Sequence, residues 1–421
     1  MNVKRLTVFA GRALALAFAG GGGGALAAPN VVVTSVSQSP SRMVTVSYDL
    51  SGEDAVVTLD VQTNTLADAR GDWVSIGLEN VRFCSGDVNR KVSQGTGKAI
   101  RWAARRSWPG QDIQTPTVRA VVKAWALDDP PDYLVVDLKG SKNVRYYEDV
   151  RQLPSDKGLA DDLYRTSELV LRRVHARNVE WYMGSPSSEL GRDKTNWDAP
   201  ETRHAVTLTN DYYLGVFELT RQQYANVCGG AVADGEGTLP LNKVAWNTMR
   251  GTVWPDGLHA VTAGNLKTFR DRTGISTWDL PTEAQWEFAC RAGTAGALYT
   301  DEELEGADVE TSERLDALAW YLGNSDGVPH RVGEKAPNAW GFYDMLGNVS
   351  EFCLDWFTVD LGTADATEPI GAAEGTHRAV RGGRYNLLPK KCRSAARENF
   401  VKPTDAKPLF GFRLTCDCRA E

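Results

Sequence analysis

Short runs in which hydrophobic and polar residues alternate cover the first part of the chain. The runs include 31–34, 43–48, 55–61 and 118–125, and turns that contain polar residues or glycine separate them. Alternation with a period of two places successive side chains on opposite faces of a strand. Several short strands between such turns are typical of a small antiparallel sandwich. The pattern therefore predicts an all-β sandwich domain at 29–128.

The pattern breaks at 128–132, where two consecutive prolines cannot continue a strand ladder or a helix. We expect a domain boundary there and a linker at 129–168. From 169 to 418 the pattern mixes strands with a few short helices and predicts an α+β domain. Its clearest helix begins after Thr282, which can cap the helix while the Gln285 side chain reaches back to the Thr282 amide.

Residues 1–28 have the features of a secretory signal peptide. Three basic residues up to Arg12 precede the short apolar run 13–18, and Ala25-Leu26-Ala27 offers the small residues that signal peptidase requires. The apolar run is too short to cross a bilayer. The alternative is a retained amphipathic anchor. We expect export to the periplasm, the extracellular space or the cell surface, and no membrane span.

Composition and charge narrow the range of partners. The chain has 421 residues, of which 42% are hydrophobic and 24% are charged, as in soluble globular proteins of two or three domains. The 47 basic and 54 acidic residues give a net charge of -7, and the basic residues are not concentrated in any one part of the sequence. Nucleic acid is therefore not expected as a partner.

Export would place the seven cysteines in an oxidising compartment, where disulfides persist. No pair of Cys-x-x-Cys motifs marks a zinc site. Because seven is odd, at least one thiol stays free or pairs between chains. The sequence leaves the pairing open for the following cysteines: Cys84, Cys228, Cys353, Cys416 and Cys418.

Six motifs follow one another along the second domain. They are Tyr182–Ser185, Tyr213–Thr220, Leu280–Glu287, Gly341–Phe352, Arg381–Gly383 and Gly411–Arg413. In this order the motifs resemble those of the formylglycine-generating enzyme, or sulfatase-modifying factor, family, which includes relatives of the ergothioneine sulfoxide synthases. The resemblance covers about 170 to 416 and implies an α+β fold of the C-type-lectin-like kind. The preceding sandwich resembles a fibronectin type III domain.

The resemblance implies a copper site that this sequence alters. In the oxidases of the family, Arg-Gly-Gly is followed by Ser and then by two cysteines that bind copper(I). Here Arg384 replaces the Ser and Leu387 replaces the first cysteine. Counting forward from Gly383 places Cys392 at the second cysteine, whereas counting back from 395–397 places it nearer a disulfide position of the family. One thiolate remains in either case, so copper is not expected and Cys392 is only a weak catalytic candidate.

The sulfoxide synthases of the family need iron held by histidines. This chain has five histidines, and no two of them lie within four residues of each other: His175, His204, His259, His330 and His377. Iron is therefore not expected either. A metal triad assembled from distant histidines and acids is the alternative.

The segment 344–351 resembles the calcium loop of the family. The resemblance implies that the side chains of Asp344 and Glu351 bind Ca²⁺ together with the backbone carbonyls of Gly347 and Val349. Carboxylate and carbonyl oxygens are the ligands that Ca²⁺ prefers. The alternative is an ordinary turn whose two acids face solvent.

The resemblance also implies one disulfide. The family pairs a cysteine near the end of the capped helix with a cysteine near the strand that follows the copper loop. In this chain the corresponding residues are Cys290 and Cys392.

Three functions follow as hypotheses. The first is an exported family member that lacks the two-cysteine copper site and acts as a binding or scaffold module for a protein, peptide or glycan. The second is an oxidoreductase of the same family that uses another metal or a single thiol. The third is a carbohydrate-binding surface protein, which the lectin-like fold and the 13 Trp residues suggest.

Overall fold

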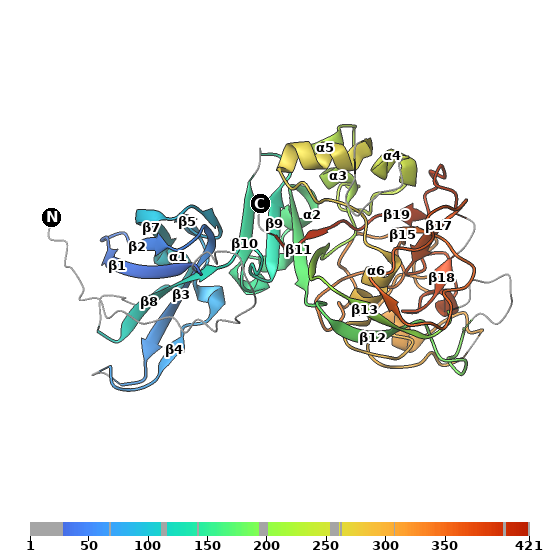
Figure 1. Cartoon of the computed structure of the whole chain (residues 1–421), viewed down its shortest axis with the longest axis horizontal. Coiled ribbons are helices and arrows are strands. Elements are labelled where there is room, and N and C mark those ends of the chain that lie inside the picture. The colour runs from blue at the N-terminus through green and yellow to red at the C-terminus, as the bar shows by residue number, and fades with distance from the viewer. Residues whose placement is uncertain are drawn as a thin grey trace, which may run out of the picture. The chain divides into compact units, whose positions relative to one another are not determined.

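The structure is a computed structural model that describes residues 28–66, 69–110, 116–140, 143–192, 201–252, 261, 263–306, 308–398 and 401–419. The rest of the predicted signal peptide, 1–27, lies outside these residues. Contacts divide the described chain into two compact units (Figure 1). The first unit holds the residues up to Val135, Val144–Asp161 and those from Cys418 onward, and the second holds Val136–Asn143 and Asp162–Asp417.

The first unit is built from two antiparallel sheets. The first sheet has the order β1 (Asn30–Gln38), β2 (Met43–Ser51), β7 (Gly95–Ala103) and β5 (Cys84–Gly86). The second has the order β4 (Trp73–Ser75), β3 (Ala55–Asn64) and β6 (Arg90–Val92), and β8 (Val118–Trp125) also pairs with β3. The unit further contains η1 (Leu78–Asn80), α1 (Ala104–Ser107), β10 (Val144–Tyr147), η2 (Val150–Gln152) and η3 (Gly158–Ala160).

One hydrophobic core joins the two sheets of the first unit. In β2 every second side chain is buried, as the alternating pattern predicts. Val46 and Tyr48 of β2 belong to the same cluster as Val57 and Leu59 of β3 and Trp102 of β7. The all-β prediction for this part of the chain thus agrees with its strands and with its core.

The second unit has several small sheets and short helices. In one sheet, β11 (Glu168–Val174), β14 (Tyr212–Gly215) and β20 (Thr415–Asp417) are neighbours in that order. A second sheet has the order β12 (Val179–Met183), β13 (His204–Leu208) and β16 (Ala366–Thr367). A third has the order β18 (Arg397–Glu398), β17 (Arg378–Arg381), β15 (Ser350–Trp356) and β19 (Phe410–Gly411). Its helices are α2 (Leu163–Thr166), α3 (Arg221–Cys228), α4 (Trp246–Arg250), α5 (Gly264–Thr273), α6 (Glu283–Arg291), α7 (Glu313–Asp316) and η4 (Pro389–Lys391). Among the described residues no helix exceeds ten residues, and none is long and apolar enough to cross a membrane.

The segment 129–168, expected to be a linker, contains regular structure. It carries β9 (Tyr133–Asp137), β10, η2, η3 and α2, and its residues are divided between the two units.

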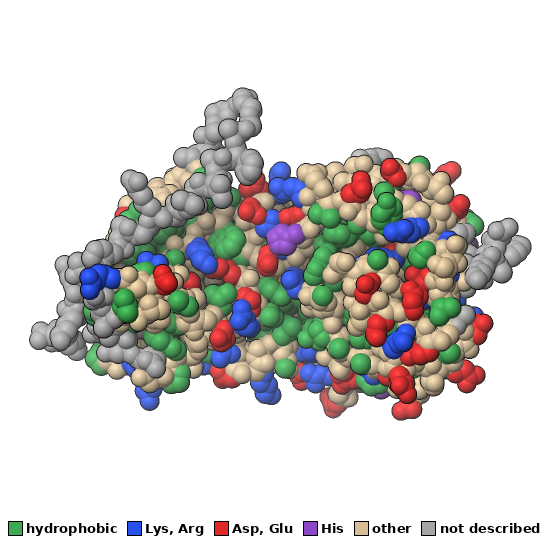
Figure 2. Space-filling view, turned by 90° about the horizontal axis from the view of Figure 1, so that it is seen from below, with side chains coloured by type: hydrophobic (Ala, Val, Ile, Leu, Met, Phe, Trp, Pro, Cys, Tyr) green, Lys and Arg blue, Asp and Glu red, His purple; other side chains and the backbone are tan. Residues whose placement is uncertain are grey.

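On the face shown in Figure 2, acidic and basic side chains are interspersed, without a continuous block of basic ones.

Helix α6 begins as the sequence predicts. The Thr282 side chain accepts a hydrogen bond from the Gln285 amide at 3.1 Å, and the Gln285 side chain accepts one from the Thr282 amide at 3.0 Å. This capping box satisfies two backbone N–H groups that the first turn leaves without helical partners. The cap fixes where the helix starts, and therefore which of its side chains point into the core.

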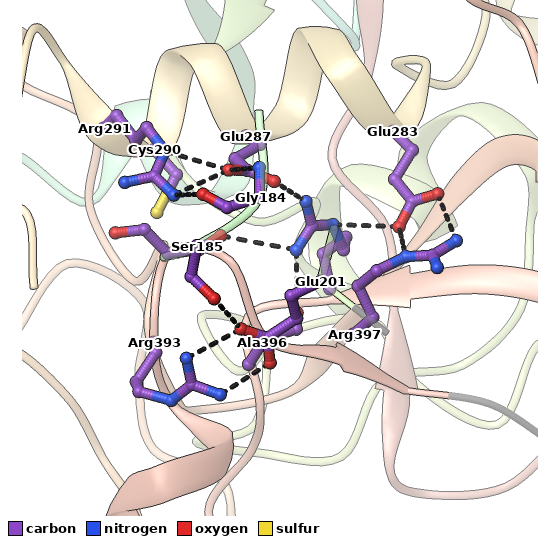
Figure 3. Close-up of polar contacts among 12 residues, drawn as sticks. Gly184, Ser185, Glu201, Glu283, Glu287, Cys290, Arg291, Arg393, Ala396 and Arg397 are labelled. Atoms are coloured by element: carbon purple, nitrogen blue, oxygen red, sulfur yellow. Dashed lines mark hydrogen bonds and ion pairs between the residues drawn. The ribbon is translucent and has the colours of Figure 1, made fainter. Parts of the chain in front are cut away.

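Three charged side chains of α6 point into a buried ion network (Figure 3). Glu283 accepts a hydrogen bond from Arg397 Nε at 2.6 Å, and Glu287 accepts one from Arg291 Nε at 2.9 Å. Arg381 of β17 joins both glutamates, with its Nε 3.2 Å from Glu283 and its Nη2 in an ion pair with Glu287. None of these side chains is more than 4% exposed.

Arg393 is a further buried arginine, and its carboxylate partners lie in the part of the chain between β12 and β13. Arg393 Nη2 donates to Glu201 at 2.6 Å, and Arg393 also forms an ion pair with Glu189. The Ser185 hydroxyl donates to Glu201 at 2.7 Å. The network therefore balances four arginines against four glutamates, and it includes residues of α6, β17 and β18 together with Glu189 and Glu201.

We predict that Arg381→Met destabilises the second unit strongly, because Glu283 and Glu287 stay buried with one cation fewer. Removal of one partner of a buried pair costs about 3–5 kcal/mol. Lys267→Met is the matched control, since Lys267 and Asp271 form an exposed ion pair along α5 whose loss costs about 0–1 kcal/mol. Urea unfolding measures both. Equal losses in the two variants would show that the buried network contributes no more than a surface pair.

Asp355 of β15 lies beside this network, and its pKa makes the stability of the fold depend on pH. Its carboxylate accepts a hydrogen bond from the Glu283 amide at 2.7 Å. Burial, followed by the Glu283 charge, raises the pKa of Asp355 to about 7. An unfolded Asp has a pKa of about 3.9, so the folded state holds this proton more tightly. The resulting stabilisation is complete below about pH 4 and is lost as the pH rises through 7.

We predict that Asp355→Asn weakens this pH dependence, because the amide oxygen keeps the acceptor without titrating. Relative to the parent, the variant should gain stability between pH 5 and pH 8, by roughly 2–4 kcal/mol at most. Melting temperatures of both proteins across this range measure the gain. Parallel curves for the two proteins would contradict the assignment.

Candidate functional site

The loop that follows β17 turns back on itself at two glycines. Gly382 and Gly383 have φ angles of 92° and 70°, which favour glycine. A Cβ at Gly383 would lie 2.5 Å from the Lys391 carbonyl oxygen and 2.7 Å from Cys392 Sγ. The end of the loop therefore packs directly against its beginning, and only glycine permits this approach.

Cys392, the weak catalytic candidate, lies behind this turn. Its side chain is fully buried, and burial raises the pKa of the thiol to about 12. Hydrogen bonding by the Arg384 backbone lowers the pKa by less than burial raises it. The group is therefore a protonated thiol at neutral pH, whereas metal binding and nucleophilic attack need the thiolate.

Arg384 is fixed at the entrance of the loop. Its guanidinium forms an ion pair with Glu398, and its Nε donates to the Asn386 side chain at 3.0 Å. The Ser350 hydroxyl lies 3.1 Å from a Glu398 carboxylate oxygen and 2.9 Å from the Gly383 carbonyl oxygen, and it can donate its single proton to either of them. These contacts join the start of the loop to β15 and β18.

A cavity of about 350 Å³ adjoins this ion pair. Arg384 and Leu387 both line it, whereas Cys392 is not among the lining residues. The apolar lining consists of Val380, Leu387, Ala396, Val401, Leu409 and Phe410. The charged lining consists of Arg384, Lys391, Arg397, Lys407 and Glu398.

All seven cysteines are thiols in the structure. Cys290 and Cys392, the expected disulfide pair, belong to one buried cluster. The Ser394 hydroxyl lies beside the Cys290 thiol and lowers its pKa, although burial still raises that pKa to about 12. The pairing of Cys290 with Cys392 stays a prediction.

The acids of the predicted calcium loop are buried, so the alternative of a solvent-facing turn does not hold. Asp344 and Glu351 are 2% and 1% exposed. Asp344 Oδ2 accepts a hydrogen bond from the Gly333 amide at 2.6 Å, but its Oδ1 is buried without a hydrogen-bond partner. Glu351 accepts hydrogen bonds from Arg413 Nη2 at 2.6 Å and from Trp286 Nε1 at 2.7 Å.

Glu218, which the sequence analysis does not single out, joins this acidic cluster. Its side chain is fully buried and accepts hydrogen bonds from the Asn348 side chain at 2.6 Å and from the Val349 amide at 3.1 Å. Burial and the charges of Asp344 and Glu351 raise the pKa of Glu218 well above its usual value. Burial also raises the pKa of Asp344, to about 6. Three buried carboxylates thus influence one another electrostatically. Arg413 offsets the charge of all three, and Arg165 also offsets the charge of Asp344.

The histidines do not gather at a site. Of the described ones, His330 stacks on Trp320 with ring centroids 3.8 Å apart, and His204 Nδ1 lies 3.0 Å from the Thr202 carbonyl. His259 lies outside the described residues. Within the described part of the chain, no group of three or more His, Cys, Asp or Glu side chains is placed to hold a metal ion by itself.

Comparisons with curated proteins find relatives of several kinds. The chain is 31% identical to formylglycine-generating enzyme of Mus musculus over 204 residues. This alignment covers 44% of this chain and 53% of the relative. It is 31% identical over 191 residues to formylglycine-generating enzyme of Streptomyces coelicolor, or 41% of this chain and 60% of the relative. It is 33% identical over 155 residues to serine/threonine-protein kinase pkn1 of Chlamydia pneumoniae, or 35% of this chain and 22% of the relative.

Two solved structures are similar over a comparable part of the chain. PvdO from Pseudomonas aeruginosa has a TM-score of 0.47 and 22% identity, over 59% of this chain and 94% of that one. Treponema denticola variable protein 1 has a TM-score of 0.44 and 24% identity, over 59% of this chain and 95% of that one.

The family comparison covers most of the second unit. The model of the sulfatase-modifying factor enzyme 1-like domain matches residues 180–418, which include the capped helix, the Arg-Gly-Gly turn and the buried acidic cluster. This match spans more than half of the 421 residues. The chain therefore belongs to the sulfatase-modifying factor enzyme 1-like family.

Proposed function

We propose that this protein is an exported binding or scaffold module that has kept the fold of its family without the copper chemistry. The proposal rests on the residues that line the cavity at the Arg-Gly-Gly turn. Arg384 and Leu387 line that cavity in place of a hydroxyl and a thiolate, and the nearby Cys392 is a buried thiol.

The chemistry of these side chains argues against oxidation of a substrate cysteine. Copper(I) prefers soft thiolate ligands, and a hydrocarbon side chain such as Leu387 has no lone pair to donate. The positive charge of Arg384 disfavours entry of a cation. The raised pKa of Cys392 also counts against an oxidoreductase that works through a single thiol.

The names of the relatives describe more than one kind of activity. Besides the formylglycine-generating enzymes and the protein kinase, the chain is 27% identical over 190 residues to chaperone protein LppX of Paenibacillus barcinonensis. Similar sequences therefore occur in proteins whose names describe different activities. A domain that binds a partner is compatible with all of them.

We also propose the finer features of the fold. The second unit is a C-type-lectin-like domain, as its short helices and small sheets suggest. The first unit is a fibronectin III-like sandwich that acts as a spacer or docking module, since its two antiparallel sheets share one core.

We propose calcium as the resident ion at 344–351. Asp344 fits this role because its Oδ1 is buried without a hydrogen-bond partner, and a cation beside it would offset the repulsion among three buried carboxylates. Asp344, the carbonyls of Gly347 and Val349, and Glu351 would hold the ion. Glu351 would share its oxygens between Arg413 and calcium. The ion would stabilise the fold and take no part in a reaction.

We predict that the protein does not convert the cysteine of a sulfatase-type peptide to formylglycine. Copper-loaded protein is incubated with the peptide under oxygen, and the peptide mass is followed, with a formylglycine-generating relative as the positive control. The mass should stay unchanged. Repeated turnover that Cys392→Ala abolishes would overturn the proposed function.

A double variant tests the reason for this inactivity. Arg384→Ser with Leu387→Cys restores the residue types of the family at both positions. If these two positions prevent metal binding, the variant should bind copper(I) more tightly than the parent. An unchanged copper(I) affinity in a folded double variant would show that the explanation is wrong.

We predict that removal of calcium lowers the melting temperature and that excess Ca²⁺ restores it. A ligand at 100 times its Kd adds about 2.7 kcal/mol to the free energy of unfolding. Asp344→Asn should reduce this response, whereas Asp271→Asn on the exposed face of α5 should leave it unchanged. A parent that does not respond to EDTA, or equal responses of the parent and Asp344→Asn, would exclude the site.

A further inference from the structure

The cavity beside Arg384 has room for one ring with its substituent. Its volume of about 350 Å³ lies at the lower end of the range of small-ligand pockets. For comparison, an apolar cavity of about 150 Å³ can hold benzene. Val380, Leu387 and Phe410 supply apolar surface to its walls. An apolar group that contacts these walls is removed from water, which favours its binding.

The charged side chains that line the cavity are paired within the chain. Three cations each form an ion pair with a carboxylate: Arg384 with Glu398, Arg397 with Glu283 and Lys407 with Asp405. Lys391 is not without a partner either. A charged ligand would have to displace one of these pairs or stay in the cavity without a counter-charge, and both are costly. The lining therefore favours a ligand that carries no charge.

Arg384 and Phe410 give the wall a preference for aromatic rings. Arg384 Nε donates to the Asn386 side chain at 3.0 Å, and its Nη1 lies in the ion pair with Glu398. A guanidinium makes such contacts in its own plane, so the partners hold Arg384 at the edge of that plane. Arg384 Cζ lies 5.5 Å from the centroid of the Phe410 ring. A further ring can stack on a guanidinium or meet Phe410 edge to face, whereas an aliphatic group of the same size can do neither.

We propose that this cavity binds one uncharged aromatic group. The ring packs against Arg384 and Phe410, and Leu387 adds apolar contact from the loop. The ring can belong to a side chain of a partner polypeptide or to a free aromatic compound, because both present the same chemistry. The proposal rests on the proposed function, since it names the ligand chemistry of the binding module.

A neutral sugar is a less suitable occupant of the cavity. Its hydroxyl groups need hydrogen-bond partners when they leave water. The charged groups of the lining are engaged in ion pairs within the chain, and the rest of the lining is largely apolar. Hydroxyl groups that enter would therefore lose the hydrogen bonds that water provides.

The exposed side chain of Leu322 separates the two sources of the ring. The Leu322 amide donates a hydrogen bond to the Leu387 carbonyl at 3.0 Å, so Leu322 lies next to a residue that lines the cavity. Its side chain is 49% exposed. A polypeptide with its aromatic side chain in the cavity can place a neighbouring residue on Leu322, whereas a free ring compound has no such residue.

The test is titration calorimetry of the full chain with four probes. They are acetyl-phenylalanine amide, acetyl-cyclohexylalanine amide, acetyl-phenylalanine with a free carboxylate, and glucose. The phenylalanine amide should bind about threefold to tenfold more tightly than the cyclohexyl compound, because only an aromatic ring gains the stacking contacts. The free acid should bind no more tightly than the amide, and glucose should not bind. Salt should leave the affinity for the amide unchanged, since the ligand is uncharged.

Variants locate the site. Arg384→Lys keeps the positive charge beside Glu398 but has no planar group on which a ring can stack. It should reduce the preference for the phenyl over the cyclohexyl compound and leave the affinity for the cyclohexyl compound unchanged. Leu387→Asp should abolish binding of both. Lys267→Gln, an exposed position on α5 outside the lining, is the matched control and should bind as the parent does. Melting curves exclude variants that do not fold.

Two further probes, acetyl-Phe-Leu-amide and p-cresol, identify the source of the ring. Tighter binding of the dipeptide than of p-cresol, which Leu322→Asp removes, would support the proposal and assign the ring to a partner polypeptide. Equal binding of the two probes, unchanged in Leu322→Asp, would support the proposal and assign the ring to a free compound.

Other outcomes would overturn the proposal. They are equal affinity for the phenyl and cyclohexyl compounds, tighter binding of the free acid than of the amide, binding of glucose, and no binding of any ring compound. An unchanged affinity in Leu387→Asp would place the ligand elsewhere, and an unchanged phenyl preference in Arg384→Lys would remove the reason for an aromatic ligand. These failures are distinct from failure of the proposed function, which would appear as turnover of a cysteine peptide to formylglycine.

Discussion

The buried ion pairs between α6 and β17 are the constraint on which the second unit depends. The described helices there have ten residues or fewer, and several strands have two to four. Little of the chain is therefore held by regular backbone hydrogen bonding. Arg381 instead fixes β17 to Glu283 and Glu287, and Arg393 forms ion pairs with Glu189 and Glu201. Because an unpaired buried charge is costly, this arrangement favours one packing of the irregular chain over others.

The same buried ion pairs flank the loop between β17 and β18. Arg381 directly precedes the Gly382–Gly383 turn, and Arg393 and Arg397 follow the loop at its other end. The loop is held at both ends by buried ion pairs. Arg384 and Leu387, which lie between these two ends, take part in none of these buried pairs. Other side chains at these two positions are therefore compatible with the same framework.

Local rules predicted the parts of the structure that depend on neighbouring residues. The cap of α6 follows from Thr282 and Gln285, which are three residues apart, and the buried face of β2 follows from alternation along one strand. Glu218 could not be predicted in this way, because its partners Asn348 and Val349 lie about 130 residues away. The same holds for Ser394 beside Cys290. Within 129–168, the polar composition after β9 suggested a linker, whereas β10 depends on pairing that composition does not reveal.

Strand β15 connects the two sites of the second unit (Figure 1). Its consecutive residues Ser350 and Glu351 point to opposite faces, as alternation in a strand requires. Ser350 contacts Gly383 and Glu398 at the cavity, whereas Glu351 contacts Arg413 and Trp286 beside the acidic cluster. An ion that fixes Glu351 would therefore also fix the backbone that positions Ser350. The acidic cluster and the cavity wall therefore lie on opposite faces of one strand, and a change in the backbone of β15 affects both.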